Sequence, residues 1–204
     1  MATVARTAAQ HDRCIMPLLS SWDSHHIRVS VKVHRSIQAA NDLEEQLGWR
    51  VASPTPDELK VATEAGLHPQ GDAPNQPFCL LPYNHPVRRD DKRISGPLWT
   101  GPLFDSDTLA AMSVERAIEL CGEEAETAVR HLTGEADLAS TQSLIITDML
   151  PKFSEIQGPP RITNLVSGLH SAGYRAAIAK WGAPAIRTDA PWTVVLETAK
   201  SCFD

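Results

Sequence analysis

The chain has 204 residues, of which 42% are hydrophobic and 22% are charged. A chain of this size and composition buries a core without disulfides or a metal, which excludes collagen, coiled coils, disulfide-rich mini-proteins and wholesale disorder. No apolar run approaches the roughly 18 residues that cross a bilayer, and the start of the chain lacks a signal-peptide stretch, so we expect a cytoplasmic protein.

The first part of the chain predicts a helix followed by a strand. Residues 3–14 are rich in alanine and predict a helix that closes near Pro17. Residues 26–34 alternate strictly between apolar and polar side chains. This alternation predicts a half-buried strand whose outer face is cationic.

The middle of the chain predicts several short elements. Residues 37–47 predict a helix, and residues 49–52 a short strand. Residues 56–65 predict a second helix, which a proline opens and the following glycine stops. Residues 67–84 are rich in proline and predict mostly irregular chain, with a strand at 78–81.

The second half is predicted to be mainly helical. Residues 95–102 are rich in glycine and proline and predict a hinge. Residues 106–121 and 140–153 then predict two helices.

The last third of the chain predicts a helix and a hairpin. Two prolines start a helix over residues 162–169, and Gly173 ends it. Residues 174–179 and 185–188 predict two strands joined by a turn at residues 181–182. Helix, helix and hairpin is the order of a winged helix, a module that binds nucleic acid or other proteins.

Positive charge is gathered in three islands, although the net charge is −6. One lies in residues 24–36, one in residues 88–93, where two aspartates are enclosed, and one in residues 156–188. If the islands converge in the fold, they form a face that binds a polyanion. The alternative is three separate solvated patches.

Three passages resemble one family of enzymes. Residues 96–105 read Gly-Pro-Leu-Trp-Thr-Gly-Pro-Leu-Phe-Asp, which resembles the G-P-L-W-x-G-P-L-x-D signature of the tRNA N2,N2-dimethylguanosine methyltransferases, enzymes that act on guanine-26 of tRNA. Residues 15–29 resemble the family's I-x-P-L-L-S…Y-V-R-V passage, and residues 169–191 its L-x-x-x-G-Y…I-K-T-D-A-P passage. The matches stand in the family's order but correspond to its back half alone.

The resemblance implies a front half that is not visible here. In the family, that half resembles a doubly wound methyltransferase domain with a Gly-rich turn for S-adenosylmethionine and an acidic motif at the reacting base. Methyl transfer to an exocyclic amine needs the donor held in line and a polar group at the nitrogen. The sequence has no G-x-G-x-G motif. Residues 80–83 read Leu-Leu-Pro-Tyr and resemble the N-P-P-Y loop of amino methyltransferases, but Leu80 replaces the side-chain amide that would accept the N–H bond. We therefore assign no catalytic residue and expect the chain alone to be inactive, S-adenosylmethionine being the cofactor of the complete family enzyme.

We expect an α+β chain in three parts. Residues 1–35 would be the tail of a methyltransferase-like sheet, and residues 96–204 a helical, winged-helix-like tRNA-binding domain. Residues 36–95 would be an inserted subdomain, replacing the four-cysteine zinc ribbon of many relatives. Cys79 is the single cysteine in that interval, and no C-x-x-C pair occurs in the chain, so we expect no metal.

The predicted function is tRNA binding within an S-adenosylmethionine-dependent tRNA guanine N2-dimethyltransferase. Three explanations for the missing donor-binding half stay open: the chain is a truncated reading frame, a stand-alone module or half of a split enzyme. A split enzyme would need a separate donor-binding chain, docked on the strand edge at residues 27–33. The alternative function is a non-enzymatic winged-helix factor that binds DNA or a protein.

The charge pattern and the resemblance together select the candidate RNA contacts, which are Arg28, Lys32, His34, Arg35, Arg88, Arg89, Lys92, Arg93, Trp99, Arg161, Arg175, Lys180 and Arg187. Arg175, Lys180 and Arg187 are favoured because a wing projects side chains away from the core. Arg28 either contacts phosphate or pairs with an acidic helix. Trp99 either stacks on a base or plugs the joint between the two halves.

Overall fold

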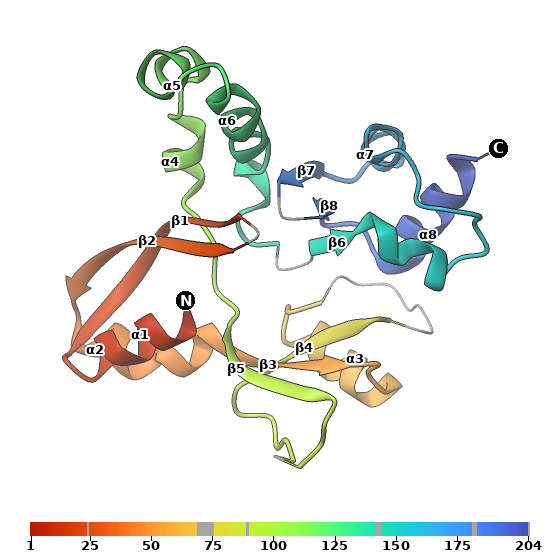
Figure 1. The fold of residues 1–204 in the computed structure, drawn as a ribbon. Helices are drawn as coiled ribbons and strands as arrows, with labels where there is room; N and C mark the ends of the chain where they lie inside the picture. The colour runs from red at the N-terminus through yellow and green to blue at the C-terminus, as the bar shows by residue number, and fades with distance from the viewer. Residues whose placement is uncertain (24, 69–75, 89, 142–143, 181–182, 204) are drawn as a thin grey trace. The chain divides into compact units, whose positions relative to one another are not determined.

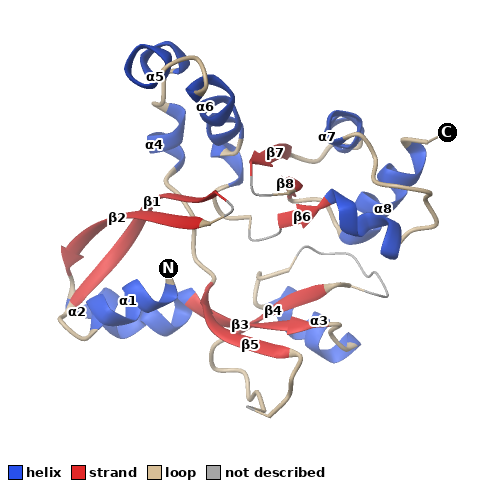
Figure 2. Ribbon diagram, viewed as in Figure 1, coloured by secondary structure: helices blue, strands red, loops and turns tan. Residues whose placement is uncertain are grey.

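The computed structural model describes residues 1–23, 25–68, 76–88, 90–141, 144–180 and 183–203. The chain mixes helix and sheet, as expected (Figure 2). It divides into two compact units, which are described separately here. Unit 1 comprises Met1–Met16 and Val31–Gly101, and unit 2 comprises Pro17–Ser30 and Pro102–Asp204. In the parts that the structure describes, no helix is both long and apolar enough to span a membrane.

A long two-stranded ribbon pairs β1 (Arg13–Asp23) with β2 (His26–Arg35) (Figure 1). The predicted strand at residues 26–34 is confirmed. The helix predicted over residues 3–14 is shorter than expected, because α1 (Ala2–Ala9) ends earlier and β1 begins at Arg13. The prediction of a half-buried strand is wrong in one respect. Ile27 on the apolar side of β2 is 76% exposed, because within the described residues β2 pairs with β1 alone.

Unit 1 is built on a three-stranded antiparallel sheet of order β4-β3-β5. Its elements are α1, α2 (Ile37–Asn41), the 3₁₀ helix η1 (Asp42–Gln46), β3 (Leu47–Ala52), α3 (Pro56–Glu64), β4 (Phe78–Pro82) and β5 (Ile94–Trp99). Helix α3 starts where predicted, since Pro56 follows a capping box between Thr55 and Glu58. It contributes Ala62 to a buried cluster with Val51, Cys79 and Leu81 of the sheet.

The predicted hinge at residues 95–102 is largely a strand instead. Residues 94–99 form β5 and pair with β3, with a register shift between Gly48 and Arg50. Most of the Gly-Pro string is therefore held inside unit 1, which ends at Gly101.

Unit 2 begins its main part with three helices, α4 (Ser106–Ala110), α5 (Val114–Cys121) and α6 (Ala125–Gly134). The single helix predicted over residues 106–121 is wrong, because the Ser113 side chain accepts from the backbone N–H of Arg116 and so caps a second helix. Helix α6 was not predicted.

The rest of unit 2 forms a second antiparallel sheet of order β6-β8-β7 with flanking helices. The elements are the 3₁₀ helix η2 (Ala136–Leu138), β6 (Leu144–Ile146), the 3₁₀ helix η3 (Thr147–Lys152), α7 (Ile162–Ser171), β7 (Ala176–Lys180), β8 (Pro184–Thr188) and α8 (Trp192–Ser201). The helix predicted over residues 140–153 is wrong, since β6 pairs with β8 there. The hairpin of β7 and β8 is confirmed, and its predicted turn at residues 181–182 lies outside the described residues.

Candidate nucleic-acid interface

Exposed cations line the ribbon strand β2. Arg28, Lys32 and Arg35 are exposed, and no ion pair or hydrogen bond of their side chains occurs among the described residues. Because side chains alternate along a strand, Arg28 and Lys32 share one face and Arg35 lies on the other. Cations without an acidic partner are available to phosphate, and each contact made releases counterions.

His34 continues the face of Arg28 and Lys32, but it has a partner. Its Nε2 lies 2.8 Å from the sulfur of Cys14 on β1. Both residues lie at the end of the ribbon that belongs to unit 1.

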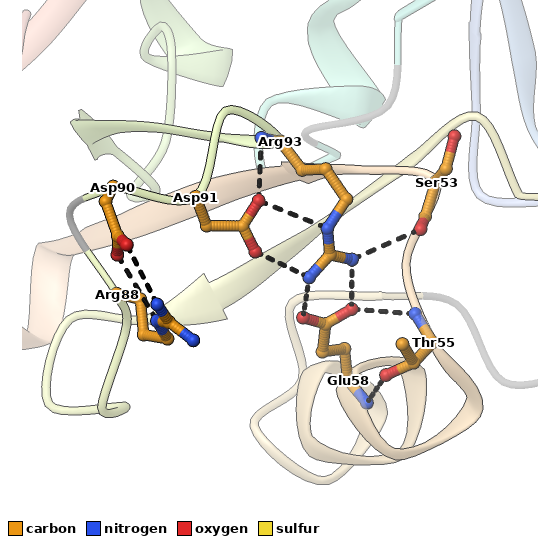
Figure 3. A network of polar contacts seen from close by, with 7 residues as sticks. All are labelled: Ser53, Thr55, Glu58, Arg88, Asp90, Asp91 and Arg93. Carbon is orange, nitrogen blue, oxygen red and sulfur yellow. Dashed lines mark hydrogen bonds and ion pairs between the residues drawn. The ribbon is translucent and has the colours of Figure 1, made fainter.

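Arg93, from the second basic island, is surrounded by carboxylates (Figure 3). Its guanidinium donates to both oxygens of Glu58 at 3.1 Å each and to both oxygens of Asp91 at 2.7 and 3.2 Å. Burial alone would raise the pKa of Glu58, but the hydrogen bonds from Arg93 and from the Thr55 N–H outweigh it and hold the pKa below its ordinary value. Arg93 hydrogen bonds likewise lower the pKa of Asp91.

This network links α3 to the segment before β5, so Arg93 stabilises the structure of unit 1. Two carboxylates already pair with the Arg93 guanidinium, and the contact of Arg93 with RNA stays a prediction. Arg88 is also paired, with Asp90 at 2.8 Å, although both side chains are largely exposed. Lys92 is exposed, and no ion pair joins it to a residue that the structure describes. Arg89 lies outside the described residues.

Trp99 is half-buried and packs within unit 1. A Cβ added to Gly101 would collide with Oε1 of Gln46 and come within 2.8 Å of the Trp99 ring. Gly96 has a φ of 139° and lies so close to β3 that a Cβ would be 3.1 Å from the Gly48 carbonyl oxygen. The glycines of the Gly-Pro-Leu-Trp string thus have packing reasons of their own. Stacking of Trp99 on a base stays a prediction.

Arg187 corrects one of the three favoured predictions for the hairpin. It is 1% exposed, and its Nε donates to the Glu135 carboxylate at 2.8 Å. A second N–H donates to the Thr141 carbonyl at 2.7 Å, and the guanidinium lies 5.8 Å from the centre of the Phe104 ring. Burial raises the pKa of Glu135, and the charge of Arg187 opposes that rise. Arg187 therefore points into unit 2, so the expectation that the wing projects it away from the core is wrong, whereas its contact with RNA stays an untested prediction.

Arg175 is exposed but also engaged. Its Nε donates to Asp189 at 2.8 Å, and its Nη1 donates to the Asp137 carbonyl at 2.7 Å. The Asp189 carboxylate also accepts from the backbone N–H of Arg175 at 2.9 Å, so this pair fixes the start of the hairpin. Lys180 ends β7, and its side chain lies outside the described residues.

Helix α7 carries a polar face that the charge count missed. Its buried positions are Leu165 and Leu169. The exposed positions of the same helix are Thr163, Asn164, Ser167, His170 and Ser171. Arg161, the residue before the helix, is exposed, and none of the described residues forms an ion pair with it. The helical spacing of Leu165 and Leu169 was the available signal, since it assigns the intervening residues to the opposite face.

The segment that resembles an N-P-P-Y loop is part of the core of unit 1. Leu80 and Leu81 are buried. The Tyr83 ring stacks on Trp49 with centroids 5.7 Å apart, and the Trp49 indole N–H donates to the Tyr83 carbonyl at 3.0 Å. These residues do not fit a site that positions a methyl donor or an amine. The convergence of the three islands stays a prediction.

Comparisons with known proteins agree on one family. A family model described as N2,N2-dimethylguanosine tRNA methyltransferase matches residues 1–200. A tRNA (guanine(26)-N(2))-dimethyltransferase from Aeropyrum pernix is 31% identical over 198 residues, which cover 95% of this chain and 45% of that protein. Its counterpart from Methanocorpusculum labreanum is 28% identical over 199 residues, covering 97% and 48%.

A solved structure, Trm1 from Pyrococcus horikoshii with S-adenosyl-L-methionine, has a similar fold. The TM-score is 0.72 at 22% sequence identity, and the match covers 97% of this chain and 47% of that one. The chain therefore spans about half the length of the relatives that it matches.

Proposed function

Since the chain belongs to the N2,N2-dimethylguanosine tRNA methyltransferase family, we propose that it supplies tRNA binding for N2-dimethylation of guanine-26. S-adenosylmethionine is the cofactor of the family, and we propose that residues outside this sequence bind it. The basis is that the residues described here include no fitting donor site, Leu80, Leu81 and Tyr83 being committed to packing.

One observation carries the proposal, the exposed cations of β2 that lack an acidic partner among the described residues. The chain as a whole is acidic, with a net charge of −6, so a general attraction to polyanions is not expected from its sum of charges. Local cations that are not neutralised supply such an attraction at one place. Arg28 and Lys32 on one face of a strand meet this condition, whereas Arg93, Arg175 and Arg187 do not.

The topology of unit 2 supports a winged-helix role for its second half. Helix α6, strand β6, η3, helix α7 and the β7–β8 hairpin follow one another in the order of that module, with β6 next to β8. In a winged helix the second long helix commonly contacts nucleic acid. Here that helix is α7, with the exposed face of Thr163, Asn164 and Ser167 and with Arg161 before it.

We propose further that the remaining part of the family's fold packs along β2. The edge of β2 that faces away from β1 has no partner strand in the described ranges. On this strand, Ile27 and Val33 are 76% and 49% exposed. An open edge with exposed apolar side chains is a template for another strand. The comparisons give no support to a separate donor-binding chain, and none is proposed.

The experiment compares binding of unmodified tRNA with binding of a duplex DNA of equal charge over a salt series. We expect tRNA to bind more tightly at every salt concentration, with a linear fall of log K against log salt. Equal binding of the two, or preference for the duplex, contradicts the proposal and favours a DNA-binding factor. Calorimetric titration with S-adenosylmethionine tests the donor site, because saturable binding by this chain alone would contradict its placement elsewhere.

A further inference from the structure

Cys14 and His34 form a close thiol–imidazole pair on the ribbon. The sulfur of Cys14 on β1 lies 2.8 Å from Nε2 of His34 on β2. His34 is exposed and Cys14 is half-buried, so the pair is not enclosed in the core. A nucleophile within hydrogen-bond distance of a base is the arrangement by which proteins activate a thiol.

One exposed cation lies on the same face of the ribbon as the pair. Arg13 and Arg35 adjoin Cys14 and His34 in sequence, and the alternation along the strands places their side chains on the opposite face of the ribbon. Lys32 lies on the same strand face as His34, two residues away. A cation on this face can stabilise the negative charge that develops on the sulfur during attack.

The other cysteines lack this combination. Cys79 is buried, and burial raises its pKa to about 12. Burial also raises the pKa of Cys202. Cys121 is exposed at the end of α5, and its thiol has no hydrogen-bond partner among the described residues. Cys121 is therefore the reference for an accessible thiol without a base.

We propose that Cys14 is a modification site for small disulfides, with His34 as the general base. The sulfur of Cys14 attacks one sulfur of a disulfide R–S–S–R, so a new S–S bond forms while the old one breaks. His34 accepts the thiol proton and passes it to the departing thiolate or to water. The products are the mixed disulfide at Cys14 and R–SH, and the disulfide itself is the oxidant. This step does not depend on tRNA binding.

The test exposes the reduced 204-residue protein to oxidised glutathione at pH 7 and follows each cysteine by mass spectrometry of its peptide. We expect Cys14 to form its mixed disulfide at least about tenfold faster than Cys121, a lower bound that lies below the roughly 10²–10⁴-fold that general bases contribute. His34→Gln should remove most of that difference. His26→Gln, a change of another exposed histidine on the same face of β2, should leave it intact.

Two results overturn the proposal. One is a rate at Cys14 no higher than the rate at Cys121, and the other is a Cys14 rate that His34→Gln leaves unchanged. Circular dichroism establishes that each variant is folded. If His34→Gln does not fold, the comparison of Cys14 with Cys121 in the unaltered protein decides the matter.

Discussion

Arg187 and Glu135 hold each other inside unit 2, with 2.8 Å between Nε and the carboxylate and side-chain exposures of 2% and 3%. The pair joins strand β8 to the residue that follows helix α6. Its members are 52 residues apart in the chain. An arginine that sequence reasoning assigns to an outer surface is thus part of the framework of this unit.

Replacing Arg187 with Met should destabilise the protein by about 3–5 kcal/mol, because the Glu135 carboxylate is left buried without its partner. Without the opposing charge, the pKa of Glu135 should rise further. The double variant Arg187→Met/Glu135→Leu should recover much of the loss, since two apolar side chains then fill the site. Urea unfolding measures these differences. A variant Arg187→Met of unchanged stability that binds tRNA more weakly would contradict the structural role.

The Arg93 network predicts that acid weakens unit 1. The folded-state pKa values of Glu58 and Asp91 lie below their ordinary values of 4.5 and 3.8. The two ionised carboxylates therefore stabilise the folded state above their ordinary pKa values. This stabilisation is lost as the pH falls through their lower pKa values in the folded state. The urea midpoint of the unaltered protein should fall with acidification over this range, and that of Arg93→Gln should fall less.

Arg88→Gln is the control for the Arg93 variant. The Arg88–Asp90 pair is exposed on both sides, so its loss should change the midpoint and its pH dependence far less than the loss of Arg93, although the charge of Arg88 also helps to lower the pKa of Asp91. An acid dependence of Arg93→Gln that equals that of the unaltered protein would show that the network contributes nothing.

Gly48 is predicted to be intolerant of any side chain. A Cβ there would lie 2.5 Å from the Leu81 carbonyl oxygen and 2.7 Å from Cγ2 of Thr100. Gly48→Ala should therefore cost about 1–3 kcal/mol through overpacking. Gly134→Ala at the end of α6 has open space around it and should be neutral or stabilising by up to about 1 kcal/mol. Thermal unfolding compares the two, and equal effects would contradict the close approach of β3 and β4.

Arg161 is predicted to contact RNA phosphate from the start of α7. Arg161→Gln should weaken tRNA binding and lower the slope of log K against log salt by about one unit, without changing stability. Lys152→Gln, an exposed change at the end of η3, is the control. Equal tRNA binding by the two variants would remove Arg161 from the interface.

Sequence patterns predicted an element well where the residues of that element alone carry the pattern. The alternation of residues 26–34 placed β2, and the Pro56 start with its capping residues placed α3. Strand β6 escaped prediction because its three residues, Leu144–Ile146, acquire their conformation by pairing with the distant strand β8. Leu144 lies opposite Arg187 and Ile145 opposite Ile186.

The candidate interface was harder to predict than the fold. Charge counting found Arg28 and Lys32, which are exposed, but it treated Arg93 and Arg187 in the same way. Asp91 lies two residues from Arg93, but the other acidic partners, Glu58 of Arg93 and Glu135 of Arg187, lie far away in the sequence and meet them only through tertiary structure. The uncharged face of α7 has no charge pattern at all, so burial of its opposite face was needed to reveal it.

We propose above all that the cations of β2, which have no acidic partner among the described residues, bind folded RNA. The salt dependence of tRNA binding by Arg28→Gln/Lys32→Gln tests this most directly. The control is Lys60→Gln/Arg116→Gln, which removes two exposed cations that have carboxylate partners. We expect the slope to be lower by about 1.4–1.8 for the β2 variant, because two phosphate contacts are lost, and to be unchanged for the control. Equal slopes for the two double variants would contradict it.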